Sequence, residues 1–368
     1  MNSIKTVACL FLILTLNLVN AQNAKNPDFD KIYSHVLTAR VDKILAIIDS
    51  IPEQSLNQKE LEIKKRYISR FLTKDEKFTF YSNDNEVQQI LNYYYSYWQM
   101  VLTREHPYDS SKLALENKIV LLLKEKYSAV QKIPTDSIKN NLQSLLSDYL
   151  GDEKKIISVI DFNSTIADIY LWEKESEKSY RVKLPDTTMS IKVTFMEDII
   201  TLGWSEFASL NKITTGGFVA NTGIYCVPKS LRYGGYELKS EKFLISYLKH
   251  ETQHFYDVPK FPNLSFADRE YRAKLIELVY AKKTLYNLIE DFTSQANTDD
   301  RENSHPYADY ILIRDLSREI FRCEFEKDMA KWKSVSKKKI NKAAYKTLQS
   351  NTKALQLKGA NVENFIMH

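Results

Sequence analysis

The sequence predicts a predominantly helical α+β fold. Residues 28–150 repeat apolar residues at helical spacings of three and four, apolar and polar residues alternate after Gly151, and helical spacing returns from Ser240 onward. With 43% hydrophobic residues among 368, a sizeable core can form, and only 8 glycines argue against an all-β sandwich or a glycine-rich nucleotide-binding fold. The net charge of +5 is mild and gives no case for nucleic-acid binding, so we expect no nucleic-acid partner.

The N-terminal residues 1–21 have the parts of a secretory signal peptide. Lys5 supplies a basic start, residues 7–16 are almost entirely apolar, and small or aliphatic residues precede Gln22. The apolar run falls short of the ~20 residues that a spanning helix needs, and Cys9 precedes most of it, which argues against a lipoprotein. We expect export, with a periplasmic or secreted protein after cleavage.

Residues 22–150 are predicted to form an all-helical N-terminal region. Its aromatic cluster at 93–98 is compatible with a platform for a peptide or glycan, but we favour a helix packed into the core.

A small β-sheet is predicted next, within a domain spanning residues 151–330. Alternation favours a hairpin whose turn is at Glu175–Lys178, then strands at 191–195 and 218–227, with a helix at 199–210 between them. Two cysteines remain after export, Cys226 and Cys323. Sequence leaves a disulfide and two buried thiols equally open.

Residues 250–254 read His-Glu-Thr-Gln-His, the pattern HExxH. On a helix, His250 and His254 lie one turn apart on the same face and can both offer a ring nitrogen to one Zn²⁺. Glu251 is rotated off that face, where it can reach a catalytic water and act as general base. The alternative is a surface helix with two ordinary histidines.

The third metal ligand is predicted from helix geometry. A loop at 258–264 and an N-cap at Ser265 place the next helix antiparallel to the first, with Glu270 at the height of His254. Glu277 lies about 10 Å deeper, level with Tyr247.

Two alternatives to this assignment remain open. Asp257 lies on the histidine face and is the rival ligand, although support of a histidine suits it better. Glu270 would be an ordinary helix residue if it paired with Lys274.

The motif HETQH followed by a helix bearing DREYRAKL resembles the gluzincin class of zinc metallopeptidases, and residues 240–285 resemble a group of exported bacterial HExxH proteins. The resemblance implies a zincin-like fold for residues 151–330. It also implies that His250, His254 and Glu270 are zinc ligands and that Glu251 is the catalytic base. The gap from His254 to Glu270 is shorter than in thermolysin-like enzymes, so their substrate preferences are not carried over.

Members of this class use a downstream His or Tyr to stabilise the oxyanion, and this chain offers His305 and Tyr307. The alternative for His305 is an ordinary residue at the start of a helix. The prediction is therefore an exported zinc metallopeptidase acting on a peptide or protein substrate. The alternatives are an envelope binding or scaffold protein with a structural or inactive zinc site, closed by Asp257, and a zinc amidase acting on cell-wall crosslinks.

The C-terminal segment 331–368 is predicted to be a basic helical tail. Lys331–Lys358 contains nine lysines and no acidic residue. Such a run can attract a membrane or an anionic cell-wall polymer, but we favour a solvated helical face.

Overall fold

The computed structural model describes residues 13–16, 32–220, 223–230, 232–299, 301 and 303–367. Apart from residues 13–16, the predicted signal peptide at 1–21 lies outside this part of the chain. The helices are α2 (Ile32–Leu37), α3 (Val41–Ser50), α4 (Gln58–Tyr67), α5 (Asn85–Leu102), α6 (Tyr108–Lys126), α7 (Thr135–Asn140), α8 (Leu142–Lys154), α9 (Trp204–Ala208), α10 (Leu248–Asp257), α11 (Phe266–Tyr280), α12 (Leu285–Gln295), α13 (Ser304–Phe321), α14 (Met329–Ser334) and α15 (Lys337–Lys358).

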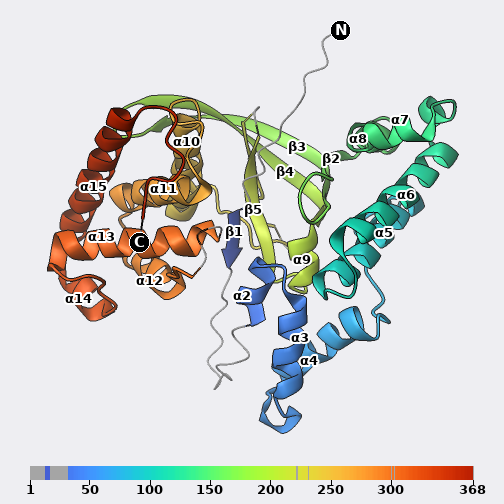
Figure 1. Cartoon of the computed structure of the whole chain (residues 1–368), viewed down its shortest axis with the longest axis horizontal. Helices are drawn as coiled ribbons and strands as arrows, with labels where there is room; N and C mark the ends of the chain where they lie inside the picture. Colours follow the sequence, from blue (N-terminus) through green and yellow to red (C-terminus); the bar gives the residue numbers. More distant parts are fainter. Residues whose placement is uncertain are drawn as a thin grey trace.

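Two groups of helices lie on opposite sides of one sheet, which confirms the α+β prediction (Figure 1). Helices α2–α8 pack together on one side, and α10–α15 pack together on the other. Each group has its own hydrophobic core, and strands of the sheet contribute residues to both cores. Among the described residues, no helix is both long enough and apolar enough to cross a membrane.

The sheet is mixed, with the strand order β1-β5-β6-β4-β3-β2. Strands β4 and β6 run parallel, and the other neighbours are antiparallel. The strands are β1 (Ile13–Leu16), β2 (Ile157–Asp161), β3 (Asp168–Lys183), β4 (Thr188–Leu202), β5 (Ile213–Ala220) and β6 (Gly223–Cys226). The short strand β1 falls within the predicted signal peptide and covers one edge of β5.

The predicted turn at Glu175–Lys178 is wrong, because these residues continue strand β3. The chain reverses after Lys183 instead, and β3 and β4 form one long hairpin that reaches both cores. Beyond Trp172, no described strand pairs with the outer edge of β3, so residues 173–179 are largely exposed. Charged residues on such an edge hinder its pairing with other chains, and a run of charged residues in the sequence is also typical of a turn.

Two other boundaries also differ from the prediction. The helix expected at 199–210 is shorter than predicted, because β4 continues to Leu202 and only Trp204–Ala208 is helical. Apolar residues at a buried sheet end satisfy both helical and strand patterns, so periodicity alone does not separate them. The single strand expected at 218–227 divides into the paired strands β5 and β6.

The aromatic cluster of α5 packs into the N-terminal core, as favoured from the sequence. Tyr94, Tyr97 and Trp98 are buried, and the Trp98 indole donates to the Ala167 carbonyl at 2.9 Å. The two cysteines left open by the sequence are both free thiols, with Cys226 buried and Cys323 partly buried.

Helix α15 occupies most of the predicted basic tail and packs against α11 and α13. Its apolar residues, among them Ile340 and Leu348, are buried, whereas its lysines are exposed or partly exposed. The basic segment is therefore mostly a packed helix with lysines on its outer face, and contact of that face with an anionic surface stays a prediction.

Candidate metal centre

The candidate site is built on α10 and α11, which are neighbouring helices joined by a short loop. Helix α11 begins where Ser265 accepts a hydrogen bond from the Asp268 backbone, as the sequence predicts for an N-cap. Helix α10 follows the π-helical segment η4 (Lys242–Tyr247) directly. Wide helical turns of this kind occur often at functional sites.

His250, His254 and Glu270 lie together in the structure. The Nε2 atom of His250 is 3.4 Å from Glu270 Oε2, and that of His254 is 3.3 Å from Glu270 Oε1. One ligand atom from each residue lies within 4.8 Å of the other two, and all three side chains are buried. The sequence therefore identified a group of residues that can hold one metal ion.

Glu277 completes the surroundings of His250 and was missed as a functional residue. Its Oε1 lies 2.7 Å from His250 Nδ1, the ring nitrogen opposite the one facing Glu270. The backbone of Glu277 was expected at the height of Tyr247, but the Glu277 side chain extends along the helix far enough to contact His250. A carboxylate on the far nitrogen of a histidine is the usual support of a metal ligand, because it orients the ring and selects the tautomer. Glu277 lies seven residues, about two helical turns, after Glu270 on α11, and this spacing is the sequence signal that could have indicated it.

Glu251 is fully buried beside the ligand group. Neither of its carboxylate oxygens accepts a hydrogen bond from the described residues. An unsatisfied buried carboxylate is costly, so the position suits a neighbouring cation or water. The fit is the one expected of a general base held off the ligand face.

Two neighbouring ion pairs argue against the alternatives of Asp257 as the third ligand and of Glu270 as the partner of Lys274. Both oxygens of Asp257 accept from Arg272, at 2.8 and 2.9 Å, and one also accepts from Gln253 at 2.9 Å. Asp257 is thus occupied, not directed at the histidines as a ligand. Lys274 contacts Asp309 at 2.6 Å rather than Glu270, which leaves Glu270 to the histidines.

His305 lies in the first turn of α13, with its Nδ1 3.1 Å from Glu270 Oε2. It is two-fifths exposed, so it connects the buried ligand group to the surface. Tyr307 is buried, and its ring centroid is 5.0 Å from the Arg301 guanidinium carbon. The structure therefore brings His305 to the ligand group, and a role for either residue in oxyanion stabilisation stays a prediction.

Burial and charge perturb the protonation of these groups. Burial raises the pKa of Glu251 to about 8. Burial lowers the pKa of His254, and it acts in the same direction on His250, but the carboxylates of Glu270 and Glu277 hold the His250 pKa well above its usual range. Burial would raise the pKa of Glu270, yet the charges of His305 and His250 hold it well below its usual range. The cluster is thus held together by charge in the absence of a metal.

The C-terminal segment contacts the first turn of α11 at Asp268, two residues before Glu270. The backbone amide of Ile366 donates to Asp268 at 2.7 Å, and Arg301 contacts the same carboxylate at 3.1 Å. Arg301 also donates to the Ile366 carbonyl at 2.5 Å. Two residues that belong to neither α10 nor α11, Arg301 and Ile366, thus hold the N-terminal turn of α11 in place.

The donor set suits a divalent cation with a preference for nitrogen and oxygen ligands. Two imidazoles and one carboxylate form the usual protein contribution to a catalytic zinc site, which keeps a further position open. Comparison of the chain with known protein families, curated proteins and solved structures found no match.

Proposed function

We propose that this chain is an exported zinc metallopeptidase that hydrolyses peptide bonds with Glu251 as general base. The observation that carries the proposal is the meeting of His250, His254 and Glu270 beside a buried carboxylate without a hydrogen-bond partner among the described residues. A carboxylate on the far nitrogen of His250 adds support, because metal-binding histidines usually have such a partner.

Each residue has a distinct role in this proposal. His250, His254 and Glu270 would hold the zinc, and Glu277 would orient His250. When bound, zinc would polarise the scissile carbonyl and activate the attacking water. Glu251 would take the proton of that water and pass it to the leaving amine. His305 or Tyr307 would stabilise the oxyanion.

Strand β5 offers a place for an extended substrate. One of its edges pairs with β6, and the other pairs with β1, which lies in the predicted signal peptide. Removal of residues 1–21 would free that edge, and an extended peptide can add to a free strand edge. Gly217 of β5 lies against Tyr247, three residues before His250, so this edge belongs to the same part of the molecule.

A structural zinc site is less well supported. It would require a fourth protein ligand, and the candidate Asp257 is already held by Arg272 and Gln253. A zinc amidase would use the same ligands, so only the substrate distinguishes it from a peptidase.

The test uses the chain beginning at Gln22. Elemental analysis of this chain should find zinc, and His254→Ala should lose it. Hydrolysis of a mixed peptide library, followed by mass spectrometry, should then show cleavage that Glu251→Gln abolishes while zinc is retained. Cleavage that survives in Glu251→Gln would remove this residue as the base, and absence of metal after zinc is supplied at neutral pH would end the proposal.

The pH profile gives a further check on Glu251. Its carboxyl must be ionised to accept a proton, so activity should fall as the pH falls. A nearby dication favours the ionised form, so the acid limb should lie below the pKa of about 8 that burial and the neighbouring side-chain charges give Glu251. An acid limb above pH 8 would contradict this assignment.

A further inference from the structure

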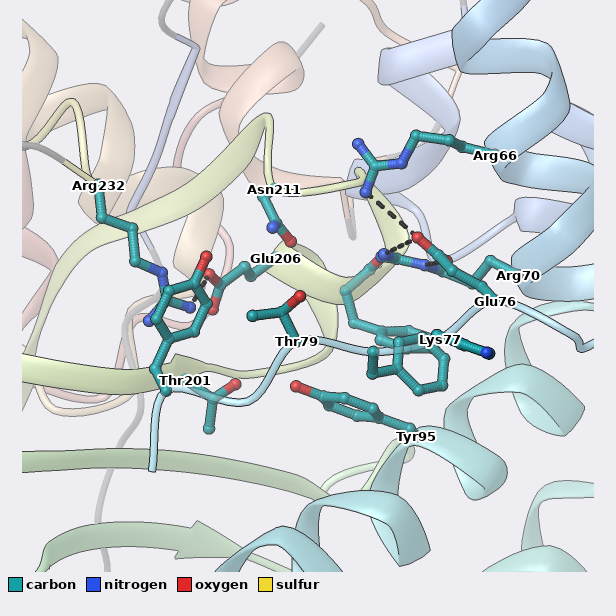
Figure 2. Close-up of a pocket in the computed structure, with 13 residues that line it drawn as sticks. Arg66, Arg70, Glu76, Lys77, Thr79, Tyr95, Thr201, Glu206, Asn211 and Arg232 are labelled. Carbon is teal, nitrogen blue, oxygen red and sulfur yellow. Dashed lines mark hydrogen bonds and ion pairs between the residues drawn. The ribbon is translucent and has the colours of Figure 1, made fainter. Parts of the chain in front are cut away.

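A polar cavity lies where the N-terminal helices meet the sheet, and the proposed peptidase reaction does not use it. Its volume is about 140 Å³. It is lined from six segments of the chain: α4 with the π-helical segment η2 (Ile68–Leu72), the following loop, α5, the end of β4, α9 with the turn after it, and the loop after β6 (Figure 2). Its polar lining residues are Arg66, Arg70, Glu76, Lys77, Thr79, Thr201, Glu206, Asn211 and Arg232.

Positive charge is in excess around this cavity. Four of the lining side chains are cationic and two are anionic, a difference of two charges. Both carboxylates are already engaged. Glu76 accepts from Arg70 at 2.5 and 2.9 Å and from Arg66 at 3.3 Å. Glu206 accepts from Arg232 at 2.8 Å and from the Tyr233 hydroxyl at 2.9 Å.

The two arginine–glutamate groups lie apart, with polar side chains between them. Figure 2 shows Arg66, Arg70 and Glu76 on one side of the cavity and Arg232 with Glu206 on the other. Thr79 and Asn211 lie between these groups. A ligand in this space would meet a cation near each end and hydrogen-bonding groups along its middle.

Two of the four cationic groups, those of Arg70 and Arg232, are built into the fold. The Arg70 side chain is 5% exposed and also donates to the Phe207 carbonyl at 2.6 Å. The Arg232 guanidinium lies over the Tyr81 ring at 3.2 Å, and its Nε is buried without a hydrogen-bond partner among the described residues. A buried donor without a partner costs free energy that a bound acceptor would recover.

The geometry points to a binding site for a small organic dianion, one that carries carboxylate or phosphoryl oxygens. Arginine forks bind both kinds of oxygen in pairs, and two negative charges would balance the excess of the lining. The cavity is smaller than the roughly 300–1,000 Å³ of pockets for drug-sized ligands, which excludes nucleotides and favours a short-chain acid. This inference does not depend on the peptidase proposal, because the two sites share no residue.

The experiment is calorimetric titration of the chain beginning at Gln22 with succinate, glutarate and inorganic phosphate at low salt. Carboxylates also bind zinc, so each titration is repeated on His254→Ala, where binding at the cavity should persist. The neutral diamide of succinate serves as the uncharged control. Binding of a dicarboxylate but not of phosphate identifies an organic acid, and the reverse order identifies a phosphoryl group.

Arg66→Gln is the variant that tests the location. Arg66 is 39% exposed, and its hydrogen bond within the described part of the chain is the long one to Glu76, so the variant should remain folded. We expect its affinity for the dianion to fall about ten-fold or more, as for loss of one charge-assisted hydrogen bond. Arg181→Gln, at an exposed position of β3 outside the cavity lining, is the matched control and should leave the affinity unchanged.

Three results would overturn the inference. One is the absence of binding by all three anions at millimolar concentration. Another is equal weakening by Arg66→Gln and Arg181→Gln, which would indicate attraction to net charge alone. The last is binding of the neutral diamide as tightly as of succinate.

Discussion

The metal centre and the arginine-lined cavity are assembled in opposite ways. The metal ligands come from two neighbouring helices and lie within 21 residues of each other along the sequence, from His250 to Glu270. The cavity is lined by residues from Arg66 to Arg232, drawn from six segments. A site on two adjacent helices leaves a motif in the sequence, whereas a site made where the N-terminal helices meet the sheet leaves none.

The two regions also differ in which charge lacks a partner. Around the metal centre, cations outside the ligand group are paired, as in Arg272 with Asp257 and Lys274 with Asp309. The two carboxylate oxygens of Glu251, beside the group, have no hydrogen-bond partner among the described residues, which suits a nearby cation. In the cavity the carboxylates are satisfied and the cations are in excess, which is the basis of the anion site that we propose there. The sign of the unbalanced charge thus indicates the ligand of each site.

The largest effect is expected where a fully paired buried charge loses its partner. In Arg272→Met, Asp257 keeps its charge without a guanidinium, and unfolding free energy should fall by about 3–5 kcal/mol. Urea denaturation measures the change. Arg318→Met is the control, because its pair with Glu324 is about half exposed and should contribute at most about 1 kcal/mol. Equal losses in the two variants would mean that burial does not set the cost.

An intermediate effect is expected at the support of His250. Glu277→Gln retains a side chain of the same size but loses the charge that holds the imidazole, so zinc affinity should fall about 10- to 100-fold. Competition with a coloured chelator measures the affinity. Glu290→Gln, an exposed glutamate on α12, should change nothing. Unchanged affinity in Glu277→Gln would reduce this contact to ordinary packing.

The smallest effect is expected at the far end of the α10–α11 pair. Glu241, just before η4, accepts from the amides of Lys282, Lys283 and Thr284 at 2.7–3.0 Å, and these bonds outweigh burial and lower its pKa to about 2. A depressed carboxyl pKa stabilises the fold above the unfolded pKa and ceases to do so as pH falls.

The loss should therefore occur between about pH 4.5 and pH 2. Glu241→Gln should cost about 1 kcal/mol at pH 7, comparable to loss of a helix cap, and less at pH 3. Thermal unfolding at both pH values measures this difference. A cost that does not change with pH would show that the ionised carboxylate is not what holds this loop.

Much of the metal centre could be predicted because its determinants are local. The HExxH spacing aligns two histidines on one helix face, and the cap at Ser265 sets the start of α11 and so the height of Glu270. Glu277 was missed because the estimate followed backbone height alone, whereas a glutamate side chain spans about one helical turn. The turn in the β3–β4 hairpin was misplaced because charges on an unpaired strand edge resemble those of a turn.

By itself, the sequence determined the alternation of helical and strand-forming segments, the motif helix and the capped helix that follows it. These depend on contacts between residues a few positions apart. Only the tertiary structure decided that Asp257 and Lys274 have other partners, that Glu277 reaches His250, and that three arginines meet around a cavity. Those outcomes depend on which distant side chains are buried together, because a buried charge is costly unless an opposite charge or a ligand is next to it.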